Sequence, residues 1–419
     1  MLNPKTNERE LAYVVTIDEI RPIEGYDKVE HARVGGWWVI VRKDQFKVGD
    51  LAIYIEVDSK VPEQEPFMFL EKRNFKVKTL KMCKVISQGL LMSVEDFGWT
   101  VENQNDENII FTGKAQHPGE EYFKVGDFLT AELGITYADA ADNKRKANSA
   151  DKYKLMAQRN GKLFSKQPFR WLMRREWGKK LLFIFFGKKK DKKNGWPAWV
   201  AKTDEERCQN MPWLFPGTDE EYFATEKIDG TSTTFTMKGF GRKREFFICS
   251  RNVVFDKPDK NCFYDTNVYV EMAEKYKIED NLSLLLDHDC YLGNECINNN
   301  IVFVTLQGET YGEGIQKRDY GLNEHRFMAF NLIIGYADGF VRRFNPREMT
   351  EILTGLEIPC VPIVDEHFKI PATCDDLLEL AGGASQIDGG MREGLVFRSL
   401  DGVKSFKAVD NAFLLKYHQ

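Results

Sequence analysis

Short apolar runs alternate with turns along the first third of the chain. Runs rich in β-branched and aromatic residues recur at roughly ten-residue spacing, at residues 11–17, 37–42, 51–57, 76–80, 82–86 and 90–94. Glycine-containing turns separate the first of them, at Gly25, Gly35-Gly36 and Gly49-Asp50. Several short strands at this spacing are typical of a small closed barrel, and an OB fold is the natural candidate. We therefore predict an OB-like β-barrel domain over residues 1–136.

A hexapeptide in this region occurs twice with one change. Phe-Lys-Val-Gly-Asp-Leu at residues 46–51 has an echo, ending in Phe, at residues 123–128. In each copy a Gly-Asp turn precedes a strand-like run. Two similar turns explain the echo more simply than a duplicated domain does, and we expect two turns.

Trp37 and Trp38 are candidates for stacking on nucleic-acid bases. OB barrels commonly use one face and its loops to bind single strands. Adjacent strand residues point to opposite faces, however. We therefore expect one of the two rings to lie in the core.

Residues 137–195 interrupt the strand pattern with a basic segment. Residues 144–193 hold 18 Lys or Arg and three Asp or Glu, although the whole chain has a net charge of −5. A basic segment inside an acidic protein suits contact with an anionic partner. We expect a helix at residues 152–159, and the apolar run at 181–186 is too short to span a bilayer. We interpret the segment as an interdomain insert, with nucleic-acid contact and a membrane-surface or partner contact as alternatives.

From residue 196 onward, strand and helix patterns mix. Thr203 and Glu206 form a capping-box pattern, which predicts a helix that continues through Gln209. Further helices are expected from apolar periodicity at residues 265–286, 349–356 and 374–381. Strand-like runs cover residues 247–252, 301–309 and 326–334, and a hairpin of residues 393–398 and 404–409 surrounds Asp401-Gly402, a type I′ turn signal. We predict an α+β protein whose third region, residues 196–419, combines antiparallel sheets and helices.

The stretch Glu-Lys-Ile-Asp-Gly-Thr-Ser at residues 226–232 suggests the chemistry. It places Lys227 two residues before an Asp-Gly turn and just after an apolar run. A lysine amine can attack the α-phosphate of a nucleoside triphosphate and hold the nucleotide as a phosphoramidate, provided that it loses its proton. Only about one free lysine in 10³ is neutral at pH 7. The site therefore needs a divalent metal or nearby cations that lower the pKa of Lys227.

Five later segments fit such a site, and their order carries more weight than any one of them. They are FICSRN at 247–252, QGE at 307–309, FMAFN at 327–331, EGLVFR at 393–398 and KSFKAV at 404–409. With the lysine stretch, the set resembles the covalent nucleotidyltransferase superfamily of ATP-dependent RNA ligases, DNA ligases and mRNA capping enzymes. Ser232 stands where DNA ligases and capping enzymes typically carry Arg, and QGETYGEGIQ at 307–316 is similar to the RNA ligases.

The chain is most similar to the Deinococcus-type RNA ligases with an N-terminal OB domain. The similarity covers most of residues 1–136 and 196–419, and includes residues 203–210, which resemble the segment before the nucleotide pocket. The resemblance implies an adenylyltransferase domain with an ATP-grasp-like ligase fold over residues 196–419. DNA ligases and capping enzymes carry a further OB domain after the last motif. The few residues after Lys407 cannot hold one, which favours an RNA ligase.

The resemblance implies a nucleotide pocket around Lys227. Lys227 becomes linked to AMP, and Asp229 supports the lysine or the ribose. Glu226 lies near the adenine edge, and Phe330 stacks on adenine. The aromatic motif usually reads Phe-Asp, whereas this chain has Asn331, so no acidic role is expected there.

It also implies how phosphate and metal are held. Arg251 and Glu309 hold the ribose and orient the phosphate, while Glu393 binds the catalytic metal with Glu309 as a second metal ligand. Lys407 contacts the α-phosphate. Many relatives carry a second lysine two positions after the first in this last motif, where this chain has Val409. Whether Lys404 takes a share in phosphate binding is left open.

The implied function is ATP-dependent ligation of RNA with Mg²⁺ or Mn²⁺, at ends that carry a 3′-OH and a 5′-phosphate, as in a nicked duplex during RNA repair. The alternatives are a DNA ligase, another polynucleotide adenylyltransferase, and an inactive nucleic-acid-binding ligase fold. The eight cysteines show no CxxC pair, and no apolar run approaches the length of a membrane span. We therefore expect a soluble, cytoplasmic protein with reduced thiols.

Overall fold

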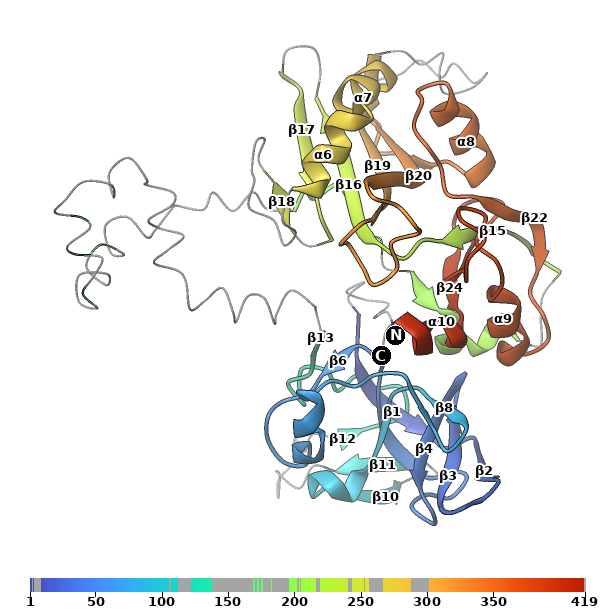
Figure 1. Ribbon diagram of the computed structural model, residues 1–419. Coiled ribbons are helices and arrows are strands. Elements are labelled where there is room, and N and C mark those ends of the chain that lie inside the picture. The colour runs from blue at the N-terminus through green and yellow to red at the C-terminus, as the bar shows by residue number, and fades with distance from the viewer. Residues whose placement is uncertain are drawn as a thin grey trace.

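The computed structural model of the chain has two parts, both rich in strands (Figure 1). The N-terminal part is drawn in blue to cyan below the larger C-terminal part, which carries helices α6 to α10. The structure describes residues 1, 3, 9–104, 107–111, 122–137, 169, 172, 175, 182, 196–201, 203, 205–215, 219–239, 243–251, 253–255, 267–287 and 301–417.

Two three-stranded antiparallel sheets form the core of the N-terminal part. Their orders are β1-β5-β9 and β2-β3-β4. The strands are β1 (Ala12–Thr16), β2 (Glu19–Ile23), β3 (Tyr26–Val34), β4 (Trp37–Arg42), β5 (Leu51–Ile55) and β9 (Leu90–Ser93). Shorter elements surround them: β6 (Ser59–Lys60), η1 (Met68–Arg73), β7 (Leu80–Met82), β8 (Val85–Ser87), η2 (Val94–Phe97), β10 (Thr100–Gln104), β11 (Glu107–Phe111), β12 (Tyr122–Phe123) and β13 (Thr136–Tyr137).

Strand β5 is buried along its whole length because apolar clusters lie on both of its faces. Ile53 and Ile55 belong to a cluster with η1 and residues 129–135, whereas Tyr54 packs in a second cluster with β3 and β4. A strand with one solvated face would alternate polar and apolar residues. The sequence Leu-Ala-Ile-Tyr-Ile does not alternate, in keeping with its central position.

The two hexapeptides form two turns of the same kind. The backbone N–H of Lys47 donates to Asp50 Oδ2 and that of Lys124 donates to Asp127 Oδ2, both at 2.7 Å. Gly49 and Gly126 adopt positive φ angles of 93° and 90°, which favour glycine. Each glycine N–H donates to a carbonyl at β1 or just after it. The prediction of two similar turns is therefore confirmed.

The tryptophan pair divides between core and surface, as alternation requires. Trp37 is 1% exposed and lies in the core of the barrel. Trp38, on the opposite face of β4, carries the guanidinium carbon of Arg21 at 4.5 Å and that of Arg33 at 5.5 Å from its ring centroid.

A six-stranded sheet forms the upper half of the C-terminal part. Its order is β18-β17-β16-β19-β20-β21, and all neighbours are antiparallel. The strands are β16 (Thr231–Lys238), β17 (Glu245–Cys249), β18 (Val254–Phe255), β19 (Ile301–Gly312), β20 (His325–Tyr336) and β21 (Val341–Arg343). Helices α6 (Val268–Lys275), α7 (Ile278–Asp287) and α8 (Pro346–Thr354) cover one face with an apolar core.

A five-stranded sheet forms the rest of the C-terminal part, in the order β14-β24-β23-β15-β22. The strands are β14 (Glu206–Arg207), β15 (Glu221–Lys227), β22 (Ile363–Lys369), β23 (Gly394–Ser399) and β24 (Ser405–Val409). Short turns η3 (Cys208–Asn210) and η4 (Pro212–Leu214) follow β14. Helix α9 (Cys374–Ala381) packs on one face, and α10 (Asn411–Tyr417) follows β24.

Three local predictions were wrong. The expected helix from Thr203 to Gln209 is instead β14 and the 3₁₀ turn η3, because Glu206 and Arg207 pair in parallel with β24. The single helix expected at residues 265–286 is two helices, broken at Lys277, whose φ is +47°. The β23–β24 hairpin has a wider loop than a type I′ turn, because Ser399 N–H donates to Lys404 O and Gly402 N–H donates back to Ser399 O. Helix α9 matches its prediction.

Asn210 connects the two parts through a buried polar network. Its Nδ2 donates to Glu56 Oε1 and to Glu206 Oε1, both at 2.7 Å. Its Oδ1 accepts hydrogen bonds from Trp37 Nε1 at 2.7 Å and from Tyr13 Oη at 3.0 Å. Because Glu56, Trp37 and Tyr13 belong to the barrel, this one side chain ties the barrel to η3 and to Glu206 of β14.

The predicted basic insert lies almost entirely outside the described residues, as does the helix expected at 152–159. The boundaries at residues 136 and 195 stay predictions. Among the described residues, no helix is long and apolar enough to cross a membrane. The described cysteines, Cys83, Cys208, Cys249, Cys360 and Cys374, are free thiols.

Candidate active site

Lys227 is the last residue of β15, at the point where the chain leaves one sheet for the other. Residues 228–230 form the turn, and Thr231 begins β16 in the six-stranded sheet. A Cβ on Gly230 would lie 2.4 Å from the Thr310 carbonyl oxygen, so only glycine allows the turn to approach β19 this closely. The Asp-Gly pair therefore places Lys227 at the joint between the two sheets.

Glu393 is the direct partner of Lys227. The Lys227 Nζ donates a 2.7 Å hydrogen bond to Glu393 Oε1. Register explains the contact, because Lys227 pairs with Gly394, the residue after Glu393. A Cβ on Gly394 would meet the Ala408 carbonyl oxygen at 2.2 Å, so the Glu-Gly pair packs β23 against β24 and directs Glu393 at the lysine.

The pKa of Lys227 is raised above its usual value. Burial is the largest single influence and acts to lower it, but the charges of Glu393, Glu309 and Asp229 together outweigh burial and raise it. The lysine in this structure is therefore an ammonium ion at neutral pH. We expected a divalent metal or nearby cations to lower this pKa. The charged neighbours that raise it here are carboxylates, and its lowering by a bound metal stays a prediction.

Glu309 faces Lys227 from the six-stranded sheet. It pairs with Ser232 across β16 and β19, one strand from the Lys227 turn. Burial, with the negative charges of Glu393 and Asp229, raises the pKa of Glu309 to about 8, against the opposing effects of Lys227 and Arg251. Arg251, just past β17, also stacks its guanidinium carbon 4.7 Å from the ring centroid of Tyr137 in β13.

The carboxyl groups fit a hydrated divalent cation. Within the described part of the chain, no three His, Cys, Asp or Glu side chains could hold a metal ion by themselves. Mg²⁺ typically keeps several waters and binds through one or two carboxylates plus substrate phosphates. Glu309 and Glu393 provide two carboxylates, and a cation between them would favour the ionised form of Glu309.

Glu226 points away from Lys227, as adjacent strand residues do. It is 1% exposed. Its carboxylate accepts a 2.5 Å hydrogen bond from Ser385 Oγ and a 2.8 Å bond from the Gln386 N–H. The structure therefore places Glu226 as the anchor of the loop that precedes Glu393, and its role at the adenine edge stays a prediction.

Phe330 lies at an apolar patch that begins beside the lysine. The patch contains Ile228, Met328 and Ile387, all partly or fully buried. Phe330 is the extra residue of an irregular register between β19 and β20. The guanidinium carbon of Arg398 lies 5.9 Å from its ring centroid. A flat apolar surface of this kind suits a purine ring, so stacking of adenine on Phe330 remains our prediction.

Lys407 lies on the same sheet face as Lys227. Thr225, two residues before Lys227, pairs with Val396, and Val396 pairs with Lys407. Arg207 in β14 lies directly opposite Lys407 and is 6% exposed. Lys407 and Arg207 therefore lie in one row on this face, and Lys227 lies two residues further along β15. Arg207 Nη2 also donates to Asp58 Oδ2 of the barrel at 3.2 Å.

Lys404 does not share this position. The exposed Lys404 Nζ forms an ion pair with half-buried Glu220, at 2.8 Å from Oε2 and 3.0 Å from Oε1. Sequence analysis left open whether Lys404 helps to bind phosphate. Its ion pair with Glu220 does not support that role.

Several residues of the site were not predicted from sequence. Arg207 was included only as part of residues 203–210, because its pairing with Lys407 spans distant parts of the chain. Tyr320 accepts a 2.7 Å hydrogen bond from the backbone N–H of Asp229 through its hydroxyl. Arg318 donates to Asp388 Oδ1 at 2.6 Å. The similarity of QGETYGEGIQ at residues 307–316 to the RNA ligases could have pointed to Arg318 and Tyr320, because it ends just before them.

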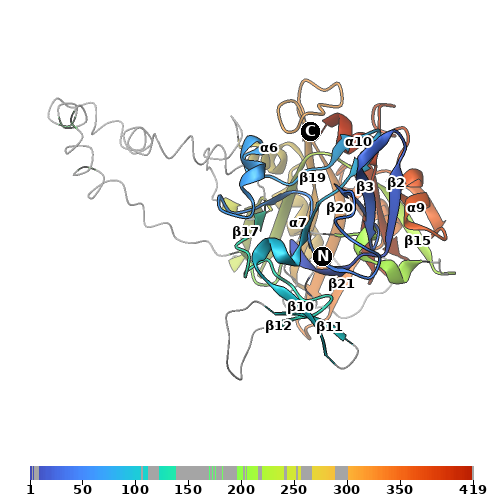
Figure 2. The ribbon, with the colours of Figure 1, turned by 90° about the horizontal axis from the view of Figure 1, so that it is seen from below.

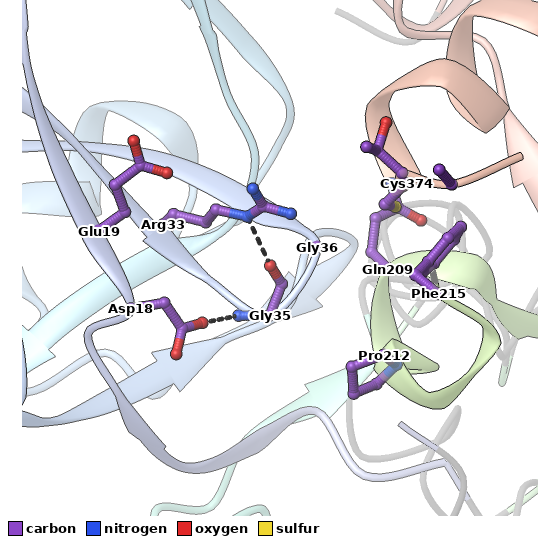
Figure 3. Close-up of a pocket in the computed structure, with 11 residues that line it drawn as sticks. Asp18, Glu19, Arg33, Gly35, Gly36, Gln209, Pro212, Phe215 and Cys374 are labelled. Atoms are coloured by element: carbon purple, nitrogen blue, oxygen red, sulfur yellow. Dashed lines mark hydrogen bonds between the residues drawn. The ribbon is translucent and has the colours of Figure 1, made fainter. Parts of the chain in front are cut away.

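A separate pocket of about 340 Å³ lies between the barrel and the C-terminal part (Figure 3). Arg33 and the Gly35-Gly36 turn line it from the barrel, facing Gln209 and Cys374. Figure 2 shows β2 and β3 on the same side of the molecule as α9. Cys374 belongs to the core on the face of the sheet opposite Lys227, so this pocket is distinct from the lysine site.

Two family models match the sequence. Residues 220–418 match the model described as RNA ligase, and residues 11–94 match a model described as an OB-fold domain. No curated protein sequence matches the chain significantly.

The fold is similar to solved structures of an RNA ligase from Naegleria gruberi. The structure with PPi has a TM-score of 0.64 and 25% identity, over 97% of this chain and 98% of that chain. An apo mutant has a TM-score of 0.66 and 25% identity, over 98% of this chain and 99% of that chain. A mutant with ATP and Mn has a TM-score of 0.65 and 25% identity, over 98% of this chain and 100% of that chain. Residues 220–418 of this chain therefore match the RNA ligase family, and residues 11–94, before them, match an OB-fold domain.

Proposed function

We propose that this protein is an ATP-dependent RNA ligase that works through a lysyl-AMP intermediate on Lys227 and seals nicks in RNA duplexes. The observation that carries the proposal is the Lys227–Glu393 contact at the joint of two sheets, with Glu309 and Asp229 around it. The similarity to a ligase solved with ATP and Mn supports ATP and a divalent metal as its requirements.

Lysine adenylation is the first step. The neutral Nζ of Lys227 attacks the α-phosphorus of ATP, a P–N bond forms, and the P–O bond to pyrophosphate breaks as pyrophosphate leaves. Lys227 must give up its proton beforehand. When bound, a divalent cation at Glu309 and Glu393 supplies positive charge that neutralises these carboxylates and the phosphate oxygens. Without the carboxylate charges, burial alone would lower the pKa of Lys227.

The remaining residues bind and orient the nucleotide. Lys407, on the same sheet face as Lys227, binds the phosphates, whereas its neighbour Arg207 is held by Asp58 of the barrel at 3.2 Å. Phe330 provides the surface for adenine, and Arg251 approaches the ribose from the end of β17. AMP then passes to the 5′-phosphate of an RNA end, and the adjacent 3′-hydroxyl displaces AMP to form the phosphodiester.

Ser232 supports RNA rather than DNA as the substrate. DNA ligases and capping enzymes typically carry Arg at this position, as noted above. Here the Ser232 hydroxyl lies 2.9 Å from the Thr203 hydroxyl, within hydrogen-bond distance. Thr203 therefore occupies the space beside Ser232 into which a longer cationic side chain would extend.

Labelling with α-³²P-ATP tests the proposal. The wild-type protein with Mn²⁺ should form a labelled band that survives a denaturing gel, and EDTA or Lys227→Ala should abolish it. Lys369→Ala is the control, because Lys369 is an exposed lysine in the same sheet. The labelled protein should then seal a nick whose 3′-OH strand ends in ribose. Equal sealing of all-DNA nicks would assign a DNA ligase instead, and absence of any label would contradict the proposal.

A further inference from the structure

The loop between β19 and β20, residues 313–324, folds back over the turn that carries Lys227. We call it the clamp loop. Gln316 Nε2 donates to the Gly230 carbonyl at 2.9 Å. The Tyr320 hydroxyl accepts the Asp229 N–H at 2.7 Å. Two side chains of one loop therefore hold the two residues of the Asp-Gly pair.

The clamp loop also holds the segment that precedes Glu393. Arg318 is 4% exposed. It donates to Asp388 Oδ1 at 2.6 Å and to the Met391 carbonyl. Its guanidinium carbon lies 4.0 Å from the ring centroid of Tyr320. The side chains that hold Asp229 and Met391 are therefore stacked on each other.

The contacts close into a ring around the reactive pair. Glu226, immediately before Lys227, binds Ser385 and Gln386 of the same segment that Arg318 holds. Met391 lies two residues before Glu393. The backbone is therefore fixed on both sides of Lys227 and just before Glu393.

Tyr320 adopts a backbone conformation that such a residue rarely takes. Its φ is +56°, in the left-handed region, although it is bulky and 4% exposed. A left-handed conformation in a residue of this size costs energy and persists only where the surroundings enforce it. Here that conformation directs the ring between Arg318 and Tyr311, whose ring centroid lies 5.1 Å away.

From this geometry we infer that Tyr320 and Arg318 are positioning residues for lysine adenylation, which set the Lys227 amine and the Glu393 carboxylate relative to each other. Neither side chain needs to contact ATP. Because the inference names a step of the lysyl-AMP pathway, it rests on the proposed function. It predicts that the clamp loop acts on the attack by Lys227 and not on the later joining of an already adenylated RNA strand.

Tyr320→Phe is the sharpest test because it removes one oxygen atom and keeps the ring. Single-turnover formation of lysyl-AMP should slow at least about tenfold, since small misplacements of a nucleophile are costly. The ATP concentration at half-maximal rate should not change. Sealing of a pre-adenylated nicked RNA should proceed at the wild-type rate, because that step does not use Lys227 as a nucleophile.

Tyr311→Phe is the matched control. It removes a hydroxyl from the neighbouring buried ring, and that hydroxyl makes no hydrogen bond with any residue that the structure describes. This variant should adenylate at the wild-type rate. If Tyr320→Phe does not fold, the exposed Gln316→Ala decides the question. It removes the bond to Gly230 and should slow adenylation by a smaller factor, with sealing of the pre-adenylated nick intact.

The outcomes separate the inference from the function on which it rests. A wild-type protein that takes no label overturns the proposed function and the inference with it. A labelled wild type with equally fast Tyr320→Phe overturns the inference alone. Equal slowing of adenylation and of pre-adenylated sealing in Tyr320→Phe, with a lowered melting temperature, would assign Tyr320 a general structural role and would also overturn it.

Discussion

Lys227 and Glu393 form a 2.7 Å ion pair, so the residue that we propose as nucleophile is held as an ammonium ion by the residue that we propose as a metal ligand. A divalent cation bound to Glu393 would weaken the attraction of this carboxylate for the lysine charge. Glu393 therefore links metal binding to deprotonation of Lys227. Its removal should make Lys227 easier to deprotonate and should weaken metal binding.

Glu393→Gln should lower the pKa of Lys227 in the metal-free protein, because it removes the negative charge that raises this pKa most. Each unit of decrease gives about tenfold more neutral amine at a fixed pH below the pKa. Acetylation of Lys227 by a limiting amount of acetic anhydride, measured by mass spectrometry, should therefore be faster in the variant. Adenylation by ATP and metal should nevertheless be lost, and the variant should remain folded.

Lys404 provides an internal control in the same experiment. It pairs with Glu220 and not with Glu393, so its acetylation rate should be the same in both proteins. If Lys227 is acetylated no faster in Glu393→Gln, the ion pair does not control the amine, and another group must hold its proton.

Glu309→Gln should change how stability depends on pH. The carboxyl of Glu309 has a pKa of about 8 in the folded protein, against an ordinary value of 4.5. Between these two values the folded state holds a proton that the unfolded state has lost, so this group contributes stability at low pH that disappears as the pH rises toward 8. Glu309→Gln should gain stability relative to wild type over that interval.

Urea unfolding at pH 5, 6, 7 and 8 in the presence of a chelator measures this difference. Glu313→Gln, an exposed glutamate just past β19, is the control and should run parallel to wild type. Parallel curves for Glu309→Gln as well would show that Glu309 is ionised throughout.

The strands and the lysine stretch could be predicted from sequence because they depend on local pattern. β-branched runs located β4, β19 and β20, and the order of short motifs brought Lys227, Glu309 and Glu393 together. The helix expected after Thr203 failed because β14 is defined by pairing with β24, some two hundred residues later, and a capping pattern contains no information on that partner. Tyr320 and Arg318 were missed for the same reason, since their partners lie in distant turns.

Glu56 should make the protein sensitive to acid. Burial, the largest influence, would raise its pKa, but the Met1 amino group, Arg9 and the Asn210 hydrogen bond lower it to about 2 from an ordinary 4.5. The stability that this depressed pKa contributes is present above pH 4.5 and is lost as the pH falls toward 2. The shift corresponds to roughly 3 kcal/mol.

Glu56→Gln should therefore be less stable than wild type at pH 7 by roughly that amount, and the gap should close as the pH falls from 5 to 2. Urea unfolding at each pH measures it, with exposed Glu102→Gln as the control. A gap that stays constant with pH would mean that the cost of the substitution comes from packing and not from charge.

Asn331→Asp should destabilise the protein, although it restores the Phe-Asp pair usual in the resembling ligases. Asn331 is 2% exposed, and its Nδ2 donates to Gln307 Oε1 at 3.0 Å, while Gln307 Nε2 donates to the Ala201 carbonyl at 2.8 Å. An aspartate would face the Gln307 oxygen, and rotation of the Gln307 amide to satisfy it would release Ala201. Either outcome leaves a buried polar group without its bond, at a cost of about 1–3 kcal/mol. Urea unfolding should show this loss, and an Asn331→Asp protein as stable as wild type would mean that residues 196–201 are not held through Gln307.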